Sequence, residues 1–172
     1  MDDRAGGELE SEVGGELELR LGCGRFTEKL DRVYFTGNVA LMGSKTTLPS
    51  DQGISGRLQR RLFNQSPFVT NLSLRFDDPD AGVLVALVYN AFGPRIVEAG
   101  SPQGGDVIAP DVFEQTQHLL DLVVRWKVSD HASVGFKWKN IAFARKRYQQ
   151  GNELVLLENR GTSVGISAEY IY

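Results

Sequence analysis

Apolar and polar residues alternate over segment after segment of this chain, and this period of two constrains the fold more than any other feature. Successive side chains of a β-strand point to opposite faces, so each such segment predicts a strand with one apolar and one polar side. In the first segment the apolar side carries Val13, Leu17, Leu19 and Leu21, and the other side carries Glu10, Glu12, Glu16 and Glu18. Helical spacing is poor almost everywhere, so we expect an all-β protein.

Five further segments alternate in the same way, and their polar sides include Arg125, Lys127, Lys137 and Lys139. Their apolar sides are Val33, Phe35, Val39 and Leu41; Phe68, Leu72, Leu74 and Phe76; Leu120, Leu122, Val124, Trp126 and Val128; Val134, Phe136 and Trp138; and Val164, Ile166, Ala168, Tyr170 and Tyr172. One more segment, 82–99, is apolar on both sides, so the pattern leaves its orientation open. The sequence therefore predicts about seven to eight strands in an antiparallel up-and-down meander, with residues 1–172 as a single domain.

The connections between these strands alternate in length. Tight turns are expected at 77–81 and 129–131, and a modest link opens at 22–24 on the same end. At the other end, long links rich in Gly, Pro, Gln and charge are expected at 49–66 and 100–116, with a shorter one around 150–152. In a meander this places short turns at one end of the sheet and long loops at the other.

Composition and motifs exclude several functions. The formal charge of -3 gives no basic field for generic nucleic-acid binding. Cys23 has no partner for an internal disulfide, and His118 and His131 do not make a zinc site on their own. No nucleophile motif or phosphate loop is present, so we expect no catalytic residues, no metal and no cofactor.

Neither a spanning helix nor a leader is evident. The longest apolar run, 83–89, is far shorter than the roughly 20 residues that a transmembrane helix needs. Residues 1–10 lack the basic and apolar parts of a secretory signal. Either the protein stays where it is made, or a signal was removed before residue 1.

Two architectures fit these strands, and they differ in which face is apolar. A soluble lipocalin-like barrel lines its interior with apolar residues around a small apolar ligand. An outer-membrane barrel turns its apolar side to lipid and has short turns at one end and long loops at the other. The alternation leaves both open, and the loop asymmetry favours the membrane barrel.

On the membrane interpretation each face has a set of candidate residues. The lumen-facing charges are Glu10, Glu12, Glu16, Glu18, Arg125, Lys127, Lys137 and Lys139, which are candidates to pair across the lumen; the lipid-facing and girdle residues are Leu17, Leu19, Phe35, Phe76, Trp126, Phe136, Trp138, Tyr170 and Tyr172. Bacterial single-chain barrels have an even number of strands. Seven strands therefore predict a fragment, or closure by strands of another chain or by a homo-oligomer.

Several segments form a recognisable set: QSPFVTNL at 65–72, DDPDAG at 77–82, VYNAFGPRI at 88–96, PDVFEQ at 110–115, HLLDL at 118–122 and KNI at 139–141, together with Arg147-Tyr148. This set resembles the C-terminal barrel strands of TonB-dependent outer-membrane receptors. The aromatic C-terminus is similar to the strand signal that the barrel-insertion machinery reads. The resemblance implies transmembrane β-strands among the lipids of a bacterial outer membrane and, for the full family, energised uptake of scarce ligands such as iron chelates.

The resemblance does not extend to every part of the family. Nothing before Glu8 could encode a plug or a TonB-contacting box, and 141–146 reads IAFARK where the family has a Leu-rich, Asp-containing stretch. We therefore expect a truncated receptor with a structural, pore-wall role in uptake, and no catalysis.

Two groups of basic residues are candidates for binding at the loop end. Arg57, Arg60 and Arg61 lie in the first long loop and are candidates for an anionic ligand; Arg145, Lys146 and Arg147 are candidates for lipopolysaccharide phosphates. For both groups the alternative is a solvated lip with no ligand.

Overall fold

The fold is described from a computed structural model, which covers residues 9–47, 59–100, 102–104 and 107–171. Its strands are β1 (Leu9–Gly22), β2 (Val33–Thr47), β3 (Gln59–Arg60), β4 (Phe68–Asp78), β5 (Val83–Phe92), β6 (Arg95–Glu98), β7 (Pro102–Gly104), β8 (Val107–Ile108), β9 (Val112–Glu114), β10 (Gln117–Ser129), β11 (Ala132–Lys139), β12 (Arg145–Gln150), β13 (Glu153–Asn159) and β14 (Ser163–Tyr170). Two short 3-10 helices, η1 (Cys23–Arg25) and η2 (Glu28–Leu30), join β1 to β2.

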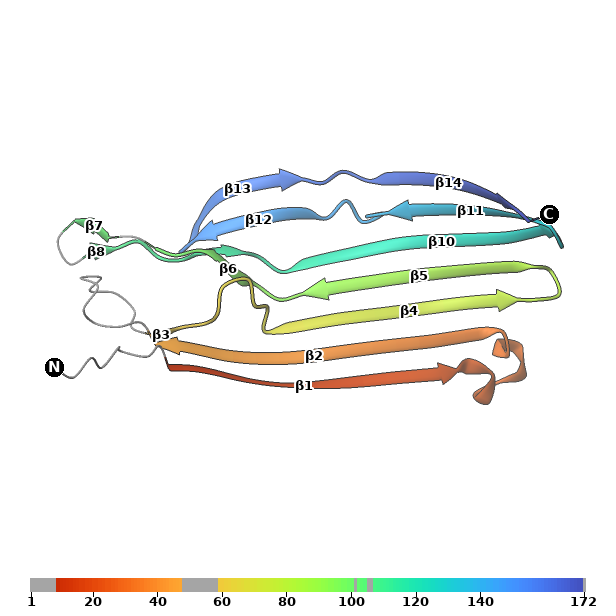
Figure 1. The fold of residues 1–172 in the computed structure, drawn as a ribbon, viewed down its shortest axis with the longest axis horizontal. Coiled ribbons are helices and arrows are strands. Elements are labelled where there is room, and N and C mark those ends of the chain that lie inside the picture. Colours follow the sequence, from red (N-terminus) through yellow and green to blue (C-terminus); the bar gives the residue numbers. More distant parts are fainter. Residues whose placement is uncertain (1–8, 48–58, 101, 105–106, 172) are drawn as a thin grey trace.

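Seven long strands form the main sheet, in the order β1-β2-β4-β5-β10-β11-β14, with β3 paired to β2 beside this path. Every neighbouring pair is antiparallel. Figure 1 shows the strands side by side in this order, as in a meander. The expected all-β antiparallel meander is confirmed.

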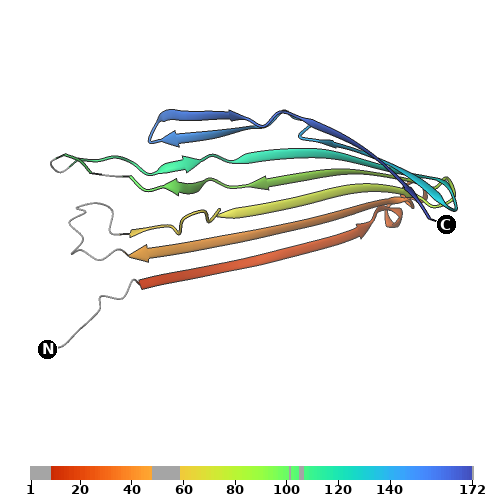
Figure 2. The ribbon, with the colours of Figure 1, turned by 45° about the horizontal axis from the view of Figure 1, so that its top comes forward.

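Four of the long strands continue beyond a break into a second sheet of order β13-β12-β9-β6. The breaks separate β5 from β6, β9 from β10, β11 from β12 and β13 from β14 (Figures 1 and 2). The sequence does not predict this extension: the expected loop 100–116 contains β7, β8 and β9. Its strands are short and carry too few alternating residues to give a clear period of two.

The sheet is open and is not closed into a barrel, so of the two expected forms, a barrel or part of one, the described residues do not form a closed barrel. Among the described residues β1 pairs only with β2, and β14 pairs only with β11. Six antiparallel pairings separate these two edge strands, so β1 and β14 run in the same direction. Two strands that run in the same direction have no antiparallel register with each other. An odd number of strands therefore leaves this meander without antiparallel closure.

The strand register places the apolar sides of all seven strands on one face of the sheet. One row runs across the whole sheet through direct partners and contains Leu21, Phe35, Leu74, Leu87, Leu122, Trp138 and Val164. The register also settles the orientation of 82–99. Val85, Leu87 and Tyr89 share the apolar face, whereas Leu84, Ala86 and Asn90 share the polar face.

Buried side chains gather mainly at the long-loop end. In the span of the main sheet the buried apolar residues are two alanines of β5, Ala86 and Ala91. Around β6 and β9 the structure buries Ile96 and Val112 together with polar and charged groups; this polar set is Asp111, Glu114 and Gln117, with Thr46 and Ser66 beside it. Most of the buried side chains therefore lie among the segments at the long-loop end, and not against a face of the main sheet.

Three links lie at the other end of the sheet (Figure 1). They are the link with η1 and η2, the turn that follows Asp78, and the turn at Asp130 and His131. The expected end is correct for these three, but the link after β1 spans residues 23–32 and is longer than a tight turn. At the long-loop end, the expected link around 150–152 is a two-residue turn, 151–152, between β12 and β13.

No helix in the described part of the chain is long and apolar enough to cross a membrane.

Candidate functional surfaces

The apolar face is uncovered. Leu74 and Leu87, in the central strands β4 and β5, are 49% and 41% exposed, and Ile166 in β14 is 78% exposed. Large apolar residues of a water-soluble monomer normally pack against a second layer, and patches above a few hundred Å² mark interaction sites. This face, which we call the apolar face, is therefore a candidate interaction surface of the described residues.

The residues expected to face lipid fall on the apolar face wherever the structure describes them. This set is Leu17, Leu19, Phe35, Phe76, Trp126, Phe136, Trp138 and Tyr170. Tyr172 lies outside the described residues. Trp126 and Tyr170 lie at the short-turn end, and Tyr89 lies at the other end with its hydroxyl 2.7 Å from Nδ1 of His118. Polar-tipped aromatic residues thus mark both borders of the apolar face.

The polar face carries the charges that the sequence assigns to it. Glu12, Glu16 and Glu18 lie on this face of β1, and the set Arg125, Lys127, Lys137 and Lys139 lies on it in β10 and β11. The backbone of Glu10 pairs with Thr46, and its side chain lies outside the description.

In the described contacts, the acidic and basic sets bind neighbouring residues and not each other. The amides of Asn38 and Gln65 donate to Glu16 and Glu12, and Glu18 pairs with Arg20. Lys127 Nζ lies 2.8 Å from Asp130 Oδ1. The acidic set lies on the edge strand β1, and three strands separate β1 from β10, the nearer strand of the basic set, so the open sheet holds the two sets apart.

A buried polar cluster lies just beyond the main sheet at the long-loop end. Glu114 in β9 is 2% exposed, and its carboxylate accepts hydrogen bonds from Arg95 Nε at 2.8 Å and Gln117 Nε2 at 3.2 Å. Arg95 Nη2 also lies 2.7 Å from Glu114 Oε2. Gln117 Oε1 is buried without a hydrogen-bond partner among the described residues. A paired carboxylate at this depth fixes β6 and β9 to the start of β10.

The two basic groups at the loop end line different hollows. Arg60 and Arg61 line one of about 500 Å³. Arg145 and Arg147, in β12, line another of about 370 Å³, and Lys146 pairs with Glu158 at 3.7 Å. Arg57 lies outside the described residues. The structure therefore does not bring the described residues of the two basic groups together.

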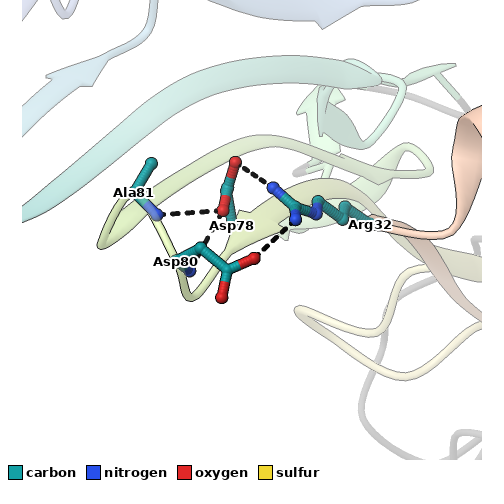
Figure 3. A network of polar contacts seen from close by, with 4 residues as sticks. All are labelled: Arg32, Asp78, Asp80 and Ala81. Atoms are coloured by element: carbon teal, nitrogen blue, oxygen red, sulfur yellow. Dashed lines mark hydrogen bonds and ion pairs between the residues drawn. The ribbon is translucent and has the colours of Figure 1, made fainter.

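Arg32 binds two aspartates at the short-turn end (Figure 3). Its guanidinium pairs with Asp78 and with Asp80 Oδ2, the latter at 2.6 Å, and Asp78 Oδ1 accepts the N–H of Ala81 at 3.0 Å. The Ala81 N–H and the Arg32 charge lower the pKa of Asp78, and the Asp78 charge raises the pKa of Arg32. In the neighbouring turn Lys127 lowers the pKa of Asp130.

Sequence reasoning missed Asp111, Glu114 and Asn140 as site residues. Asp111 pairs with Arg60, and Glu114 pairs with Arg95, 19 residues earlier in the chain. Asn140 bridges Ala144 and Gly161 with a backbone φ of 54°. The sequence gives no signal for such partners, apart from the break in alternation after Lys139. In the described residues, no group of three or more His, Cys, Asp or Glu side chains is arranged to hold a metal ion.

Comparison with protein-family models, curated proteins and solved structures found nothing that matches this chain.

Proposed function

We propose that this chain forms part of the wall of an outer-membrane β-barrel, similar to the C-terminal strands of a TonB-dependent receptor. In this role the apolar face meets lipid, the polar face lines the lumen, and the chain contributes structure to uptake without catalysis. The observation that carries the proposal is the apolar face itself. Every one of the seven strands contributes apolar side chains to the same uncovered surface, and the opposite surface carries the charges.

The height of the apolar face supports a membrane span. In β10 it runs from His118 to Trp126, a stretch of nine residues. A transmembrane strand of a tilted barrel needs about 9–11 residues. The Tyr89–His118 pair at one border and Trp126 with Tyr170 at the other occupy the positions where outer-membrane barrels carry aromatic girdles.

The two open edges indicate what completes the wall. Unpaired backbone groups in lipid cost several kcal/mol each, so β1 and β14 need neighbours in a bilayer. Identical copies in one orientation would join β14 to β1 in parallel, because the two edges run in the same direction. We therefore propose that an odd number of further strands joins these edges. Such a set gives an even total and antiparallel pairing throughout.

Tryptophan fluorescence tests this proposal directly, because the chain has two tryptophans and both lie on the apolar face. The protein is refolded into vesicles of phosphatidylcholine with brominated acyl chains, and single-tryptophan variants Trp126→Phe and Trp138→Phe separate the two signals. We expect brominated lipid to quench both tryptophans and aqueous acrylamide to quench them weakly. Trp138, in the row of Leu74, should respond to deeper bromine positions than Trp126.

Circular dichroism in buffer and in detergent micelles accompanies the quenching. A β spectrum that requires detergent, with a heat-dependent shift in gel migration, would support the membrane wall. A cooperative β fold in plain buffer, with no quenching by brominated lipid, would overturn it in favour of the lipocalin-like barrel with an apolar ligand inside.

A further inference from the structure

The larger hollow at the long-loop end combines one apolar wall with a concentration of positive charge. It has a volume of about 500 Å³ and is lined by Ser44, Lys45, Arg60, Arg61, Ile96, Asp111 and Phe113. Three of these residues are cationic and one is anionic. Ile96 and Phe113 are direct partners across β6 and β9 and supply the apolar wall.

Described backbone contacts hold the hollow in shape. Arg60 pairs with Thr46, which lies on the polar face at the end of β2. The N–H of Leu62 donates to Ser44 Oγ at 3.0 Å, and the N–H of Asn64 donates to the carbonyl of Ile96 at 2.9 Å. Hydrogen bonds therefore hold residues 60–64 against both β2 and β6, and they fix the backbone positions of Arg60 and Arg61.

Arg60 is the residue that points to a ligand. Its side chain is only 10% exposed, and its described ion pair, from Nη1 to Asp111 Oδ1, is long at 3.5 Å. The same Asp111 oxygen accepts the N–H of Gly100 at 2.9 Å, so its charge is shared. Arg60 Nε is buried with no hydrogen-bond partner among the described residues. A guanidinium has five N–H donors, and leaving such a group unsatisfied in a buried place is costly.

We propose that this hollow binds a small ligand that carries a carboxylate or phosphate next to an apolar group. The oxyanion would accept from the guanidinium of Arg60, with Lys45 and Arg61 adding charge at the more exposed rim. Arginine presents a planar fork that matches such oxyanions, and hydrogen bonds between charged groups are the strong ones. The apolar group would lie against Ile96 and Phe113. This inference deepens the proposed function and rests on it, since it assigns a ligand class to the loop end of the pore wall.

Phenyl phosphate is a suitable probe, with inorganic phosphate and phenol as its two halves. Binding is measured by calorimetry on the full chain refolded in a neutral detergent. We expect phenyl phosphate to bind more tightly than either half. Arg60→Gln should weaken phenyl phosphate roughly 10- to 100-fold, the factor that corresponds to a hydrogen bond between charged groups. Arg60→Lys keeps the charge without the planar fork and should recover only part of the affinity.

Arg145→Gln is the matched control, because Arg145 lines the other hollow. It should leave the affinity unchanged. Equal binding by the wild type, Arg60→Gln and Arg145→Gln would overturn the assignment, as would the absence of phenyl phosphate binding by a wild type that shows its β spectrum. The spectra of the variants verify that they fold.

Competition then identifies the source of the oxyanion. Detergent micelles doped with diphosphorylated lipid A displace phenyl phosphate if the natural ligand is a lipid headgroup, and leave it bound if the ligand is a soluble anion. Both outcomes presuppose binding that depends on Arg60. Brominated-lipid quenching in the same preparation keeps the two proposals separate. Quenching without phenyl phosphate binding removes the ligand and keeps the membrane wall. Binding without quenching removes the membrane wall and, with it, the assignment of this ligand to a pore.

Discussion

The span of the main sheet and the loop end of the molecule differ in the residues that they bury. In the span, large apolar residues such as Leu74 and Leu87 are exposed, and the buried apolar side chains are the small Ala86 and Ala91. At the loop end, Ile96 and Val112 are buried, and the ion pair of Glu114 with Arg95 lies beside them. A water-soluble domain buries large apolar residues and leaves charges at its surface. The loop end follows this rule in part and the span inverts it, which is the pattern expected where the solvent of the span is lipid.

The largest effect on stability is expected from a charge placed on the apolar face. Leu74 lies between Phe35 and Leu87 in the row that crosses the sheet. We expect Leu74→Arg to destabilise the fold in bilayers by about 2 to 4 kcal/mol, the cost of arginine on the lipid face of a barrel near the midplane. Urea unfolding in vesicles, followed by tryptophan emission, measures the difference.

Ser73→Arg is the matched control on the same strand. Ser73 points to the polar face between Thr36 and Val88, so an arginine there meets the proposed lumen. It should change stability by less than about 1 kcal/mol, in the range of ordinary surface substitutions. Equal costs for the two arginines would mean that the two faces meet the same solvent, and the comparison would fail.

At the loop end we expect the stability to fall when a charge is removed, in contrast to the apolar face, where it falls when a charge is added. Arg95→Ala leaves Glu114 at 2% exposure without its cation. We expect a loss of about 2 to 3 kcal/mol, below the roughly 3 to 5 kcal/mol of a fully buried pair, because the Arg95 side chain is 32% exposed and water reaches it. The double variant Arg95→Met/Glu114→Leu removes both charges and should recover most of the loss. A double variant as unstable as Arg95→Ala would show that packing, and not the ion pair, holds this end.

Asn140 lies where the two regions meet, at the break between β11 and β12. Its side chain accepts the N–H of Ala144 and donates to the carbonyls of Ala144 and Gly161, in a backbone with φ of 54°. Asn140→Ala loses these bonds and strains the backbone, and we expect a cost of about 2 kcal/mol. Asn140→Gly accepts the positive φ and should cost about 1 kcal/mol less. Hydrogen exchange at Ala144 reports whether the junction opens; equal exchange in both variants and the wild type would exclude this role.

The sequence predicts the span of this protein far better than its loop end. Seven strands and their apolar sides follow from a period of two, because each strand turns alternate side chains to an apolar and a polar face. The short turns follow from their Gly, Pro and Asp residues. The orientation of 82–99 does not follow, since Leu84 and Val88 of the polar face are as apolar as Leu87. At the loop end the decisive partners, such as Arg60 with Asp111, are 51 residues apart and carry no periodic signal. The resemblance to a receptor family and the assignment of the two faces to lipid and lumen stay predictions.

The smallest effect is expected from acid at the short-turn end, where Arg32, Asp78 and Asp80 are partly exposed. The pKa of Asp78 is lowered from its ordinary 3.8 by the N–H of Ala81 and by Arg32. A carboxylate with a lowered pKa in the folded state contributes stability that is present above pH 3.8 and is lost as the pH falls through the folded pKa. The unfolding midpoints of the wild type and Asp78→Asn should therefore differ at pH 7 and converge as the pH falls below 3.8 and through the lowered pKa of Asp78. High salt should shrink the difference, because asparagine keeps an Oδ1 acceptor for the N–H of Ala81 and lacks only the charge that pairs with Arg32. A difference that vanished in salt would assign the turn to charge pairing alone, whereas one that stayed constant from pH 7 to pH 3 would exclude Asp78 as the titrating group.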